Sequence, residues 1–321
     1  MRLHYSFALL ALLAAPAGAQ TAPIALPGPP VPATAPPEPA PPAEPRWRTQ
    51  GKSGLNLNEA TLSSNWRGGG ANTLGLSALA DVKANRKSGI HSFDNEADLL
   101  FAFSQTAGLG YRKTQDRLYL DTKYGRAISP NWDTFLSLNL LSQFAPGYRY
   151  DTGPTGNPLA RQVSDFFAPA YITAAYGFEY HPNPAFHVRL APFAPRLTVV
   201  NRVERFVEAI GPAPFGVNPG HSTRWELLAA QILAELDQNL GANVNLKARY
   251  LLFANYETLE FRRLNHRLDL TLTAKVNRFV NVSLTGTALY NYDQDSALQY
   301  SQGLTLGVAY AFQNFADPLK K

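Results

Sequence analysis

The feature that most constrains this chain is a repeated alternation of apolar and polar residues in stretches of about ten. Residues 268–276 read LDLTLTAKV, and residues 280–290 read VNVSLTGTALY. Because successive side chains of a β-strand point to opposite faces, each stretch predicts a strand with one apolar face and one strongly polar face. A tilted strand needs about nine to eleven residues to cross a lipid bilayer. The pattern therefore favours a transmembrane β-barrel.

The same alternation recurs from one end of the chain to the other. It predicts twelve strands, at residues 54–66, 72–85, 93–106, 116–125, 132–144, 166–180, 186–200, 224–237, 242–254, 260–276, 280–292 and 302–313. The eighth is ambiguous, because ELLAAQILAEL (226–236) has as much helical as strand character. The expected fold is thus an all-β, antiparallel barrel of about twelve strands, with ten to fourteen possible.

The lengths of the connections agree with this fold. Outer-membrane barrels have long external loops and short periplasmic turns, which alternate along the chain. The two longest predicted gaps, 145–165 and 201–223, both follow odd-numbered strands and so fall at the same end. Three gaps after even-numbered strands are short: 181–185, 237–241 and 277–279. The segment 85–92, which also follows an even-numbered strand, is longer than this rule expects.

The chain begins with two segments that are not part of the barrel pattern. A basic start and an apolar run at 7–15 lead into Ala17-Gly18-Ala19, which is typical of a secretory signal peptide at 1–19. Residues 20–46 hold 11 of the 25 prolines and few large apolar residues, which predicts a disordered periplasmic tether. The tether is either a spacer or a contact to a periplasmic partner. The barrel is then expected at 47–313, with a tail at 314–321.

Composition removes several classes of protein. The absence of cysteine excludes a disulfide scaffold and thiolate metal sites. The net charge of +5 is spread along the chain, so no nucleic-acid partner is expected. No apolar run reaches 18 residues, which argues against membrane-spanning helices. We expect no cofactor and no metal. His187, His221 and Ser222 are the best candidates for catalysis, but they form no recognisable nucleophile–base arrangement, so no catalytic residue is assigned.

Charged residues on the polar faces of the strands are candidates for the barrel lumen. Asp121 and Lys123 share the inward phase with Tyr119, which puts both signs of charge on one strand. The lumenal candidates are Asp121, Lys123, His187, Arg189, Lys247 and Arg249. Such residues form either a selectivity filter or a network of salt bridges that fills the interior, and small barrels usually fill their interiors.

The last predicted strand carries a candidate assembly signal. Thr305, Gly307, Tyr310 and Phe312 follow a spacing that resembles the terminal signal read by the barrel-assembly machinery. The apolar stripe of this strand is expected to face outer-membrane lipid. The chain departs from the usual pattern because residues 313–321 follow the terminal aromatic residue.

Several motifs together resemble one family. The stretch 47–75 contains Asn65-Trp66 and a glycine turn formed by Gly68, Gly69 and Gly70. Further motifs follow in order: RKTQDRLYLDTKYG (112–125), QFAPGY (143–148), DFFAPAY (165–171), LAPFAPRLTVV (190–200) and YDQD (292–295). The chain resembles the domain-of-unknown-function family numbered three thousand and seventy-eight. The resemblance implies an exported outer-membrane barrel and carries no activity.

Three functions therefore stay open for a protein expected in the outer membrane. The first is a non-enzymatic pore or solute-binding barrel. The second is a structural or assembly barrel with a filled lumen, whose tether contacts a periplasmic partner or peptidoglycan. A membrane-embedded hydrolase is third, because no catalytic constellation is evident.

Overall fold

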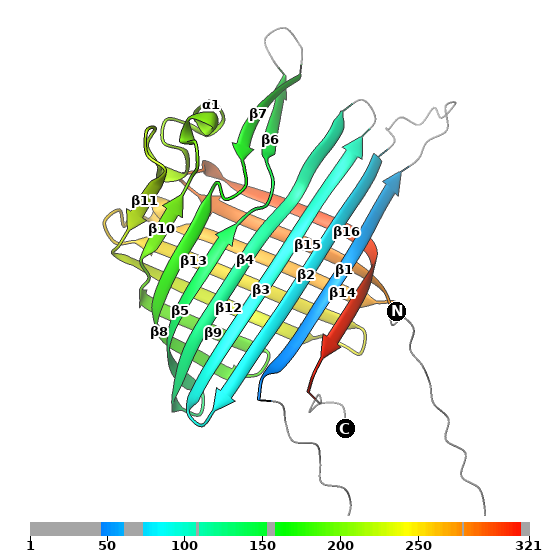
Figure 1. Ribbon diagram of the computed structural model, residues 1–321, viewed down its shortest axis with the longest axis vertical. Coiled ribbons are helices and arrows are strands. Elements are labelled where there is room, and N and C mark those ends of the chain that lie inside the picture. The colour runs from blue at the N-terminus through cyan, green and yellow to red at the C-terminus, as the bar shows by residue number, and fades with distance from the viewer. Residues whose placement is uncertain (1–45, 61–72, 107–108, 153–157, 278, 316–321) are drawn as a thin grey trace, which may run out of the picture. The chain divides into compact units, whose positions relative to one another are not determined.

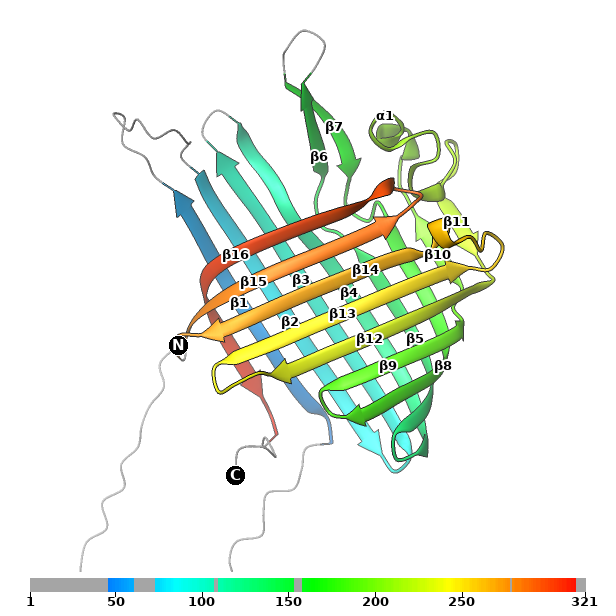
Figure 2. The same cartoon turned by 180° about the vertical axis from the view of Figure 1, so that it is seen from behind.

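The computed structural model describes residues 46–60, 73–106, 109–152, 158–277 and 279–315. Most of them lie in antiparallel strands (Figures 1 and 2). The strands of the barrel wall are β1 (Arg48–Ala60), β2 (Thr73–Ser88), β3 (His91–Thr106), β4 (Gly110–Ser129), β5 (Trp132–Ser142), β8 (Ala170–Asn183), β9 (Phe186–Phe193), β12 (Ala229–Asn239), β13 (Val244–Asn255), β14 (Asn265–Lys275), β15 (Val280–Asn291) and β16 (Asp295–Gln313).

Two pairings join the sheet into a closed barrel. The first strand, β1, pairs with the last, β16, and β8 pairs with β9. Between these joints each strand pairs with its neighbour, so the twelve strands form a complete barrel. The prediction of a twelve-stranded antiparallel barrel is confirmed. The expected signal peptide and, except for Arg46, the expected tether lie outside the described residues.

Two of the predicted strands are each interrupted once. The strand expected at 186–200 consists of β9 and β10 (Arg196–Val199), and the one at 224–237 of β11 (Thr223–Glu226) and β12. Pro192 and Pro195 lie at the first interruption, where proline has no N–H for the ladder. Beyond these breaks β10 pairs with β8 and β11. The ambiguous stretch 226–236 is strand rather than helix, apart from Leu227 and Leu228.

The connections differ in length at the two ends of the barrel, which we call the loop end and the turn end. At the turn end, β2 and β3 run on to a two-residue turn at Gly89 and Ile90, where Gly89 has a φ of +58°. The segment 85–92 is therefore strand rather than a long turn. At the loop end, the connection after β5 contains a hairpin that was not predicted, β6 (Gly147–Thr152) and β7 (Pro158–Ser164).

The second long connection, between β10 and β11, also has structure of its own. It holds η1 (Val203–Phe206), α1 (Val207–Ile210) and η2 (Pro214–Gly216), and it lies at the same end as the hairpin (Figures 1 and 2). Its apolar side chains form a small core together with Ala168 of the first long connection; the core consists of Ala168, Val200, Val203, Phe206, Phe215 and Val217. The prediction that the two longest connections share one end is thus confirmed. Among the described helices, none is long and apolar enough to cross a membrane.

Burial in the barrel wall is the reverse of that in a water-soluble protein. On β5, Leu136 and Leu138 are 57% and 55% exposed, while the intervening Ser137 and the next residue, Asn139, are buried. On β16, Leu306, Val308 and the following aromatic residues are likewise exposed on the outside. A surface of this kind is stable only against an apolar medium. The prediction that the apolar stripe faces outward is confirmed.

Candidate functional site

The interior of the barrel holds a polar cavity of about 710 Å³ that extends from its middle to the turn end. Nine Asp and Glu side chains and eight Lys and Arg side chains line this lower chamber, so its wall is almost neutral. The wall includes all six predicted lumenal residues, Asp121, Lys123, His187, Arg189, Lys247 and Arg249. The strict alternation of their strands places them inside. A role for these residues in solute selection stays a prediction.

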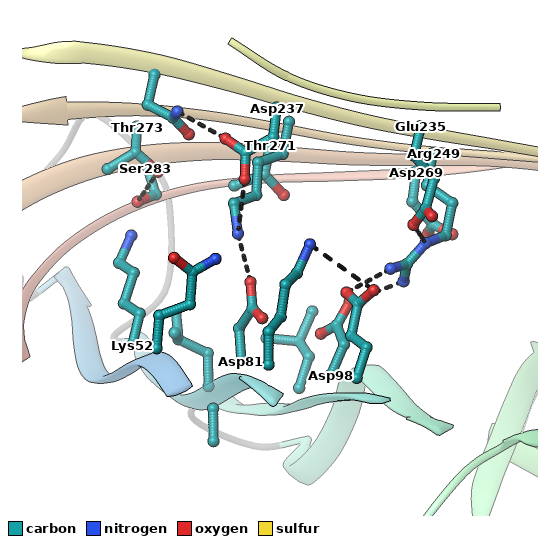
Figure 3. Close-up of a pocket in the computed structure, with 18 of the residues that line it drawn as sticks. Lys52, Asp81, Asp98, Glu235, Asp237, Arg249, Asp269, Thr271, Thr273 and Ser283 are labelled. Carbon is teal, nitrogen blue, oxygen red and sulfur yellow. Dashed lines mark hydrogen bonds and ion pairs between the residues drawn. The ribbon is translucent and has the colours of Figure 1, made fainter. Parts of the chain in front are cut away.

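Arg249 on β13 joins opposite walls of the barrel. Its Nη2 lies 2.5 Å from Oε1 of Glu96, and its Nη1 lies 3.2 Å from Oδ2 of Asp98; both carboxylates are on β3. Five strands separate β3 from β13 on either side, so the two strands are diametrically opposed. The Nε of Arg249 also donates to Oε1 of Glu235 on the adjacent β12, at 2.6 Å. Figure 3 shows Arg249 reaching from the wall that carries Glu235 toward Asp98.

A second arginine makes the same crossing from the other wall. Arg117 on β4 lies 2.9 Å from Oδ2 of Asp98 and 3.2 Å from Oδ1 of Asp269 on β14, which is directly opposite β4. Asp269 is held in place by Arg267 at 2.7 Å and by the Thr287 hydroxyl at 2.7 Å. We call the residues that connect the walls the ion-pair layer: Glu96, Asp98, Arg117, Glu235, Arg249 and Asp269.

The other predicted lumenal residues are also paired. Lys123 lies 2.6 Å from Glu179, and Arg189 lies 3.1 Å from the same carboxylate and 2.6 Å from Asp121. His187 contacts Glu235 at 2.7 Å, and Lys247 pairs with Asp81 on β2. A salt-bridge network was one of the two arrangements predicted from the sequence; the other was a selectivity filter. The charged side chains of the network cross the middle of the lumen.

A second cavity, of about 300 Å³, lies toward the loop end, and we call it the upper chamber. Its wall includes Tyr119, which lies under the guanidinium of Arg249 in the ion-pair layer at 4.1 Å. Arg196, Asn139 and Gln231 also line it. Arg196, Asn139 and Gln231 were not among the residues predicted for the lumen. The sequence feature that could have pointed to them is their place on the inward face of a strand, but most polar residues of the barrel share this feature.

The predicted assembly residues divide between the two faces of β16. Thr305 lies on the lower chamber wall, and Gly307 packs against Asn56, while Tyr310 and Phe312 are exposed outside. The remaining motif residues, Asn65, Trp66, Gly68, Gly69 and Gly70, lie outside the described residues. Whether β16 is read as an assembly signal stays a prediction.

The structure does not bring the candidate catalytic residues together. His187 is near the turn end, at the start of β9, whereas His221 and Ser222 belong to the connection at the loop end. His221 and Ser222 are exposed, and their described hydrogen bonds are those of the backbone, to Asn218 and Val200. Within the described ranges, no group of three or more His, Asp or Glu residues is placed to hold a metal ion.

The long connections at the loop end are fixed by polar contacts outside the barrel wall. Arg205 on η1 lies 2.6 Å from Asp165, and Arg161 on β7 lies 2.9 Å from Glu208 on α1. Glu204 accepts a hydrogen bond from the Gly220 amide at 3.0 Å. Its own amide and that of Gly220 lower the pKa of the Glu204 carboxyl, since both stabilise the ionised form. These contacts tie the hairpin to the helical segment.

Solved structures similar to this chain are bacterial membrane barrels of low sequence identity. An outer membrane channel from Pseudomonas putida F1 is 10% identical, with 86% of this chain and 100% of that chain covered and a TM-score of 0.36. The translocator domain of the autotransporter NalP from Neisseria meningitidis is 11% identical, over 84% and 89% of the chains, with a TM-score of 0.34. The toluene transporter TbuX from Ralstonia pickettii is 9% identical, over 85% and 90%, with a TM-score of 0.30.

Among curated proteins, none matches this chain significantly. A family model does match part of it. Residues 57–148, which run from the end of β1 to the start of the β6–β7 hairpin, match the family described as "Protein of unknown function (DUF3078)", and this confirms the family resemblance seen in the sequence motifs.

Proposed function

We propose that this protein is a non-enzymatic outer-membrane barrel that binds or admits small polar solutes through a lumen divided by the ion-pair layer. The apolar outer wall supports a membrane location, and a closed barrel satisfies every backbone group that would otherwise face lipid. The observation that carries the proposal is the crossing of the lumen by Arg249, which reaches Glu96 and Asp98 on the opposite wall. Polar chambers lie on both sides of this crossing.

The form of the barrier supports a passage that can open. Among the residues that the structure describes, side chains rather than a folded domain cross the lumen, and each crossing is made by a long arginine with several rotatable bonds. The balance of charge on the wall argues against strong selectivity for ions of one sign. A solute that offers its own polar groups can replace the ion pairs one at a time as it passes.

The same ion pairs favour a second candidate function. A barrel filled by salt bridges would serve as a rigid anchor, and the proline-rich segment 20–46 would then contact peptidoglycan or a periplasmic partner. This candidate requires no passage through the ion-pair layer. It predicts a silent barrel and a cellular defect when residues 20–46 are removed.

Conductance in a planar lipid bilayer distinguishes the two. The proteins to compare are the refolded full chain, Arg117→Gln/Arg249→Gln, and Arg262→Gln as a control. Arg262 is 63% exposed and pairs with Glu260 at the loop end, so its loss leaves the layer intact. We expect small, weakly selective openings for the wild type and for Arg262→Gln, and a several-fold larger conductance for the double variant. If all three proteins fold and stay silent, the passage is refuted and the anchor is favoured.

A further inference from the structure

Arg196 is a buried cation in the upper chamber that lacks the partner its neighbours have. It lies on β10, its side chain is about 95% buried, and it lines the cavity. Within the described residues, its guanidinium makes no hydrogen bond and no ion pair within 4 Å, and its Nε is fully enclosed. By contrast, Arg117, Arg189 and Arg249 each contact at least two carboxylates.

The carboxylate closest in register to Arg196 is already engaged elsewhere. Glu226 lies directly across the β10–β11 pair, but its Oε1 accepts from Asn255 at 3.1 Å and lies 3.4 Å from Arg224. Arg224 has a closer partner in Asp293, at 2.6 Å, and the Glu226 carboxylate makes no ion pair with Arg196 within 4 Å. The Arg196 guanidinium instead rests on the ring of Phe253, with its carbon 3.1 Å from the ring centroid. Stacking of this kind holds the plane of the guanidinium and leaves its N–H edge free for an acceptor.

Two buried amides beside Arg196 are also unpartnered. Asn139 and Gln231 are each about 4% exposed, both line the upper chamber, and neither side-chain amide makes a hydrogen bond within the described residues. Asn139 Nδ2 and Gln231 Oε1 are fully enclosed atoms without a partner. Buried polar groups are nearly always hydrogen-bonded, so three such groups around one cavity indicate a site for a polar ligand.

The charge at this site matches a monoanion. Asp116 also lines the chamber, but Lys113 at 3.0 Å and the amides of Phe144 and Ala145 satisfy its oxygens. Arg267, the other arginine of this wall, pairs with Asp269 at 2.7 Å, so among the described residues that line the chamber Arg196 is the arginine without an ion pair within 4 Å. An arginine fork binds a planar carboxylate with two parallel hydrogen bonds, and a second negative charge would lie unbalanced near Asp116.

The size and lining of the chamber restrict the rest of the ligand. About 300 Å³ is the space of roughly ten water molecules, which suits a ligand of about ten non-hydrogen atoms. Part of the wall is apolar: Leu141, Val163, Pro169, Leu251 and Leu289. We infer that the upper chamber binds a small monocarboxylate with an apolar body and one hydrogen-bond donor, such as a hydroxy acid. The carboxylate accepts from the guanidinium of Arg196, and Asn139 and Gln231 supply further polar groups of the same wall.

This inference rests on the proposed function, since it names the solute class for one chamber of the same lumen. The test is isothermal titration of the refolded full chain with 3-hydroxybutyrate and 4-hydroxybenzoate. Their methyl esters serve as uncharged controls. The variants are Arg196→Gln, Arg196→Lys, Asn139→Leu and Arg262→Gln as the matched arginine control. We expect binding of at least one acid and of neither ester. Arg196→Gln should weaken binding at least tenfold, Arg196→Lys should weaken it less, and Arg262→Gln should bind as the wild type does.

Failure of the inference and failure of the proposed function give different results. Binding that depends on Arg196, in a barrel without conductance, supports the site and refutes the passage. Conductance without binding of either acid up to 10 mM overturns the site and leaves the passage standing. Thermal unfolding provides a further check that needs no ligand. Because Arg196 has no ion-pair partner, Arg196→Gln should unfold at the wild-type temperature or above it, and a large loss of stability would overturn the assignment.

Discussion

The ion-pair layer makes a quantitative prediction for the stability of the barrel when Arg249 is replaced by glutamine. Removal of one partner from a buried ion pair costs about 3–5 kcal/mol, because a charge is left buried and uncompensated. Each carboxylate that Arg249 contacts keeps another partner, however: Asp98 keeps Arg117 at 2.9 Å, and Glu235 keeps the imidazole of His187 at 2.7 Å. Glu96 keeps only a distant lysine at 3.7 Å. We therefore expect the lower end of this range, about 3 kcal/mol, which is roughly a hundredfold in the unfolding constant.

The assay is urea unfolding of the barrel in lipid vesicles, followed by tryptophan fluorescence and by the electrophoretic shift between folded and unfolded barrels. Arg262→Gln is the control, since it removes an arginine from an exposed pair at the loop end and should leave the midpoint unchanged. Adding Glu96→Gln to Arg249→Gln should recover part of the loss, because it removes the least compensated carboxylate. The reasoning is refuted if Arg249→Gln and Arg262→Gln unfold at the same urea concentration, or if Glu96→Gln only adds to the damage.

Three further predictions concern other parts of the chain. Gly177→Ala should destabilise the barrel by about 1–3 kcal/mol or more in the same urea assay, because a Cβ there would lie 2.0 Å from a carbonyl oxygen of β9, where β8 and β9 pair. Gly286→Ala should have little effect, because the space around Gly286 is open. Equal losses of stability in the two variants would show that no steric clash occurs at Gly177. If β16 carries the assembly signal, Phe312→Ala should lower the amount of heat-modifiable barrel in cell envelopes but not refolding in vitro, whereas Tyr300→Ala at the other end of the strand should do neither. Because the pKa of Glu204 is lowered in the folded state, its contribution to the stability of the loop-end structure is present above the ordinary pKa of 4.5 and is lost as the pH falls through the folded-state value. Acid should therefore speed proteolysis of residues 200–222 in the wild type, and less so in Glu204→Gln. Identical effects of acid on the two proteins would refute this prediction.

The barrel itself was predictable because membrane strands obey a strict local rule. Each strand must offer apolar residues to lipid and polar ones to the lumen, so a period of two is written into the sequence without reference to any partner. The strands at 268–276 and 280–290 show how direct this is, since their phase alone fixes which residues line the lumen. The hairpin β6–β7 and the helices after β10 obey no such rule. They form a small apolar core around Phe206 and Phe215, whose partners come from distant positions and carry no periodic signal.

The pairing of lumenal charges was less predictable than their location. Alternation places Arg249 and Asp98 inside, but which wall faces which depends on the number of strands and on closure, and these are properties of the whole chain. Once twelve strands are fixed, β3 must lie opposite β13 and β4 opposite β14. The crossings made by Arg249 and Arg117 then follow from strand order, because each arginine is placed opposite an aspartate.

The same reasoning explains why Arg196 gave no signal of its own. In the sequence, Arg196 is one of many basic residues on the inward face of a strand. Glu226, further along the chain, would be expected to form an ion pair with it. Only the fold shows that Glu226 contacts Arg224 and Asn255. It also shows that, beyond the break at Pro195, β10 pairs with β8 and β11. Because burial of an unpaired charge is costly, a barrel that keeps one beside two unpartnered amides must satisfy all three in some other way. In the lower chamber, Arg117, Arg189 and Arg249 each pair with at least two carboxylates. In the upper chamber, the ligand takes the place of such a partner.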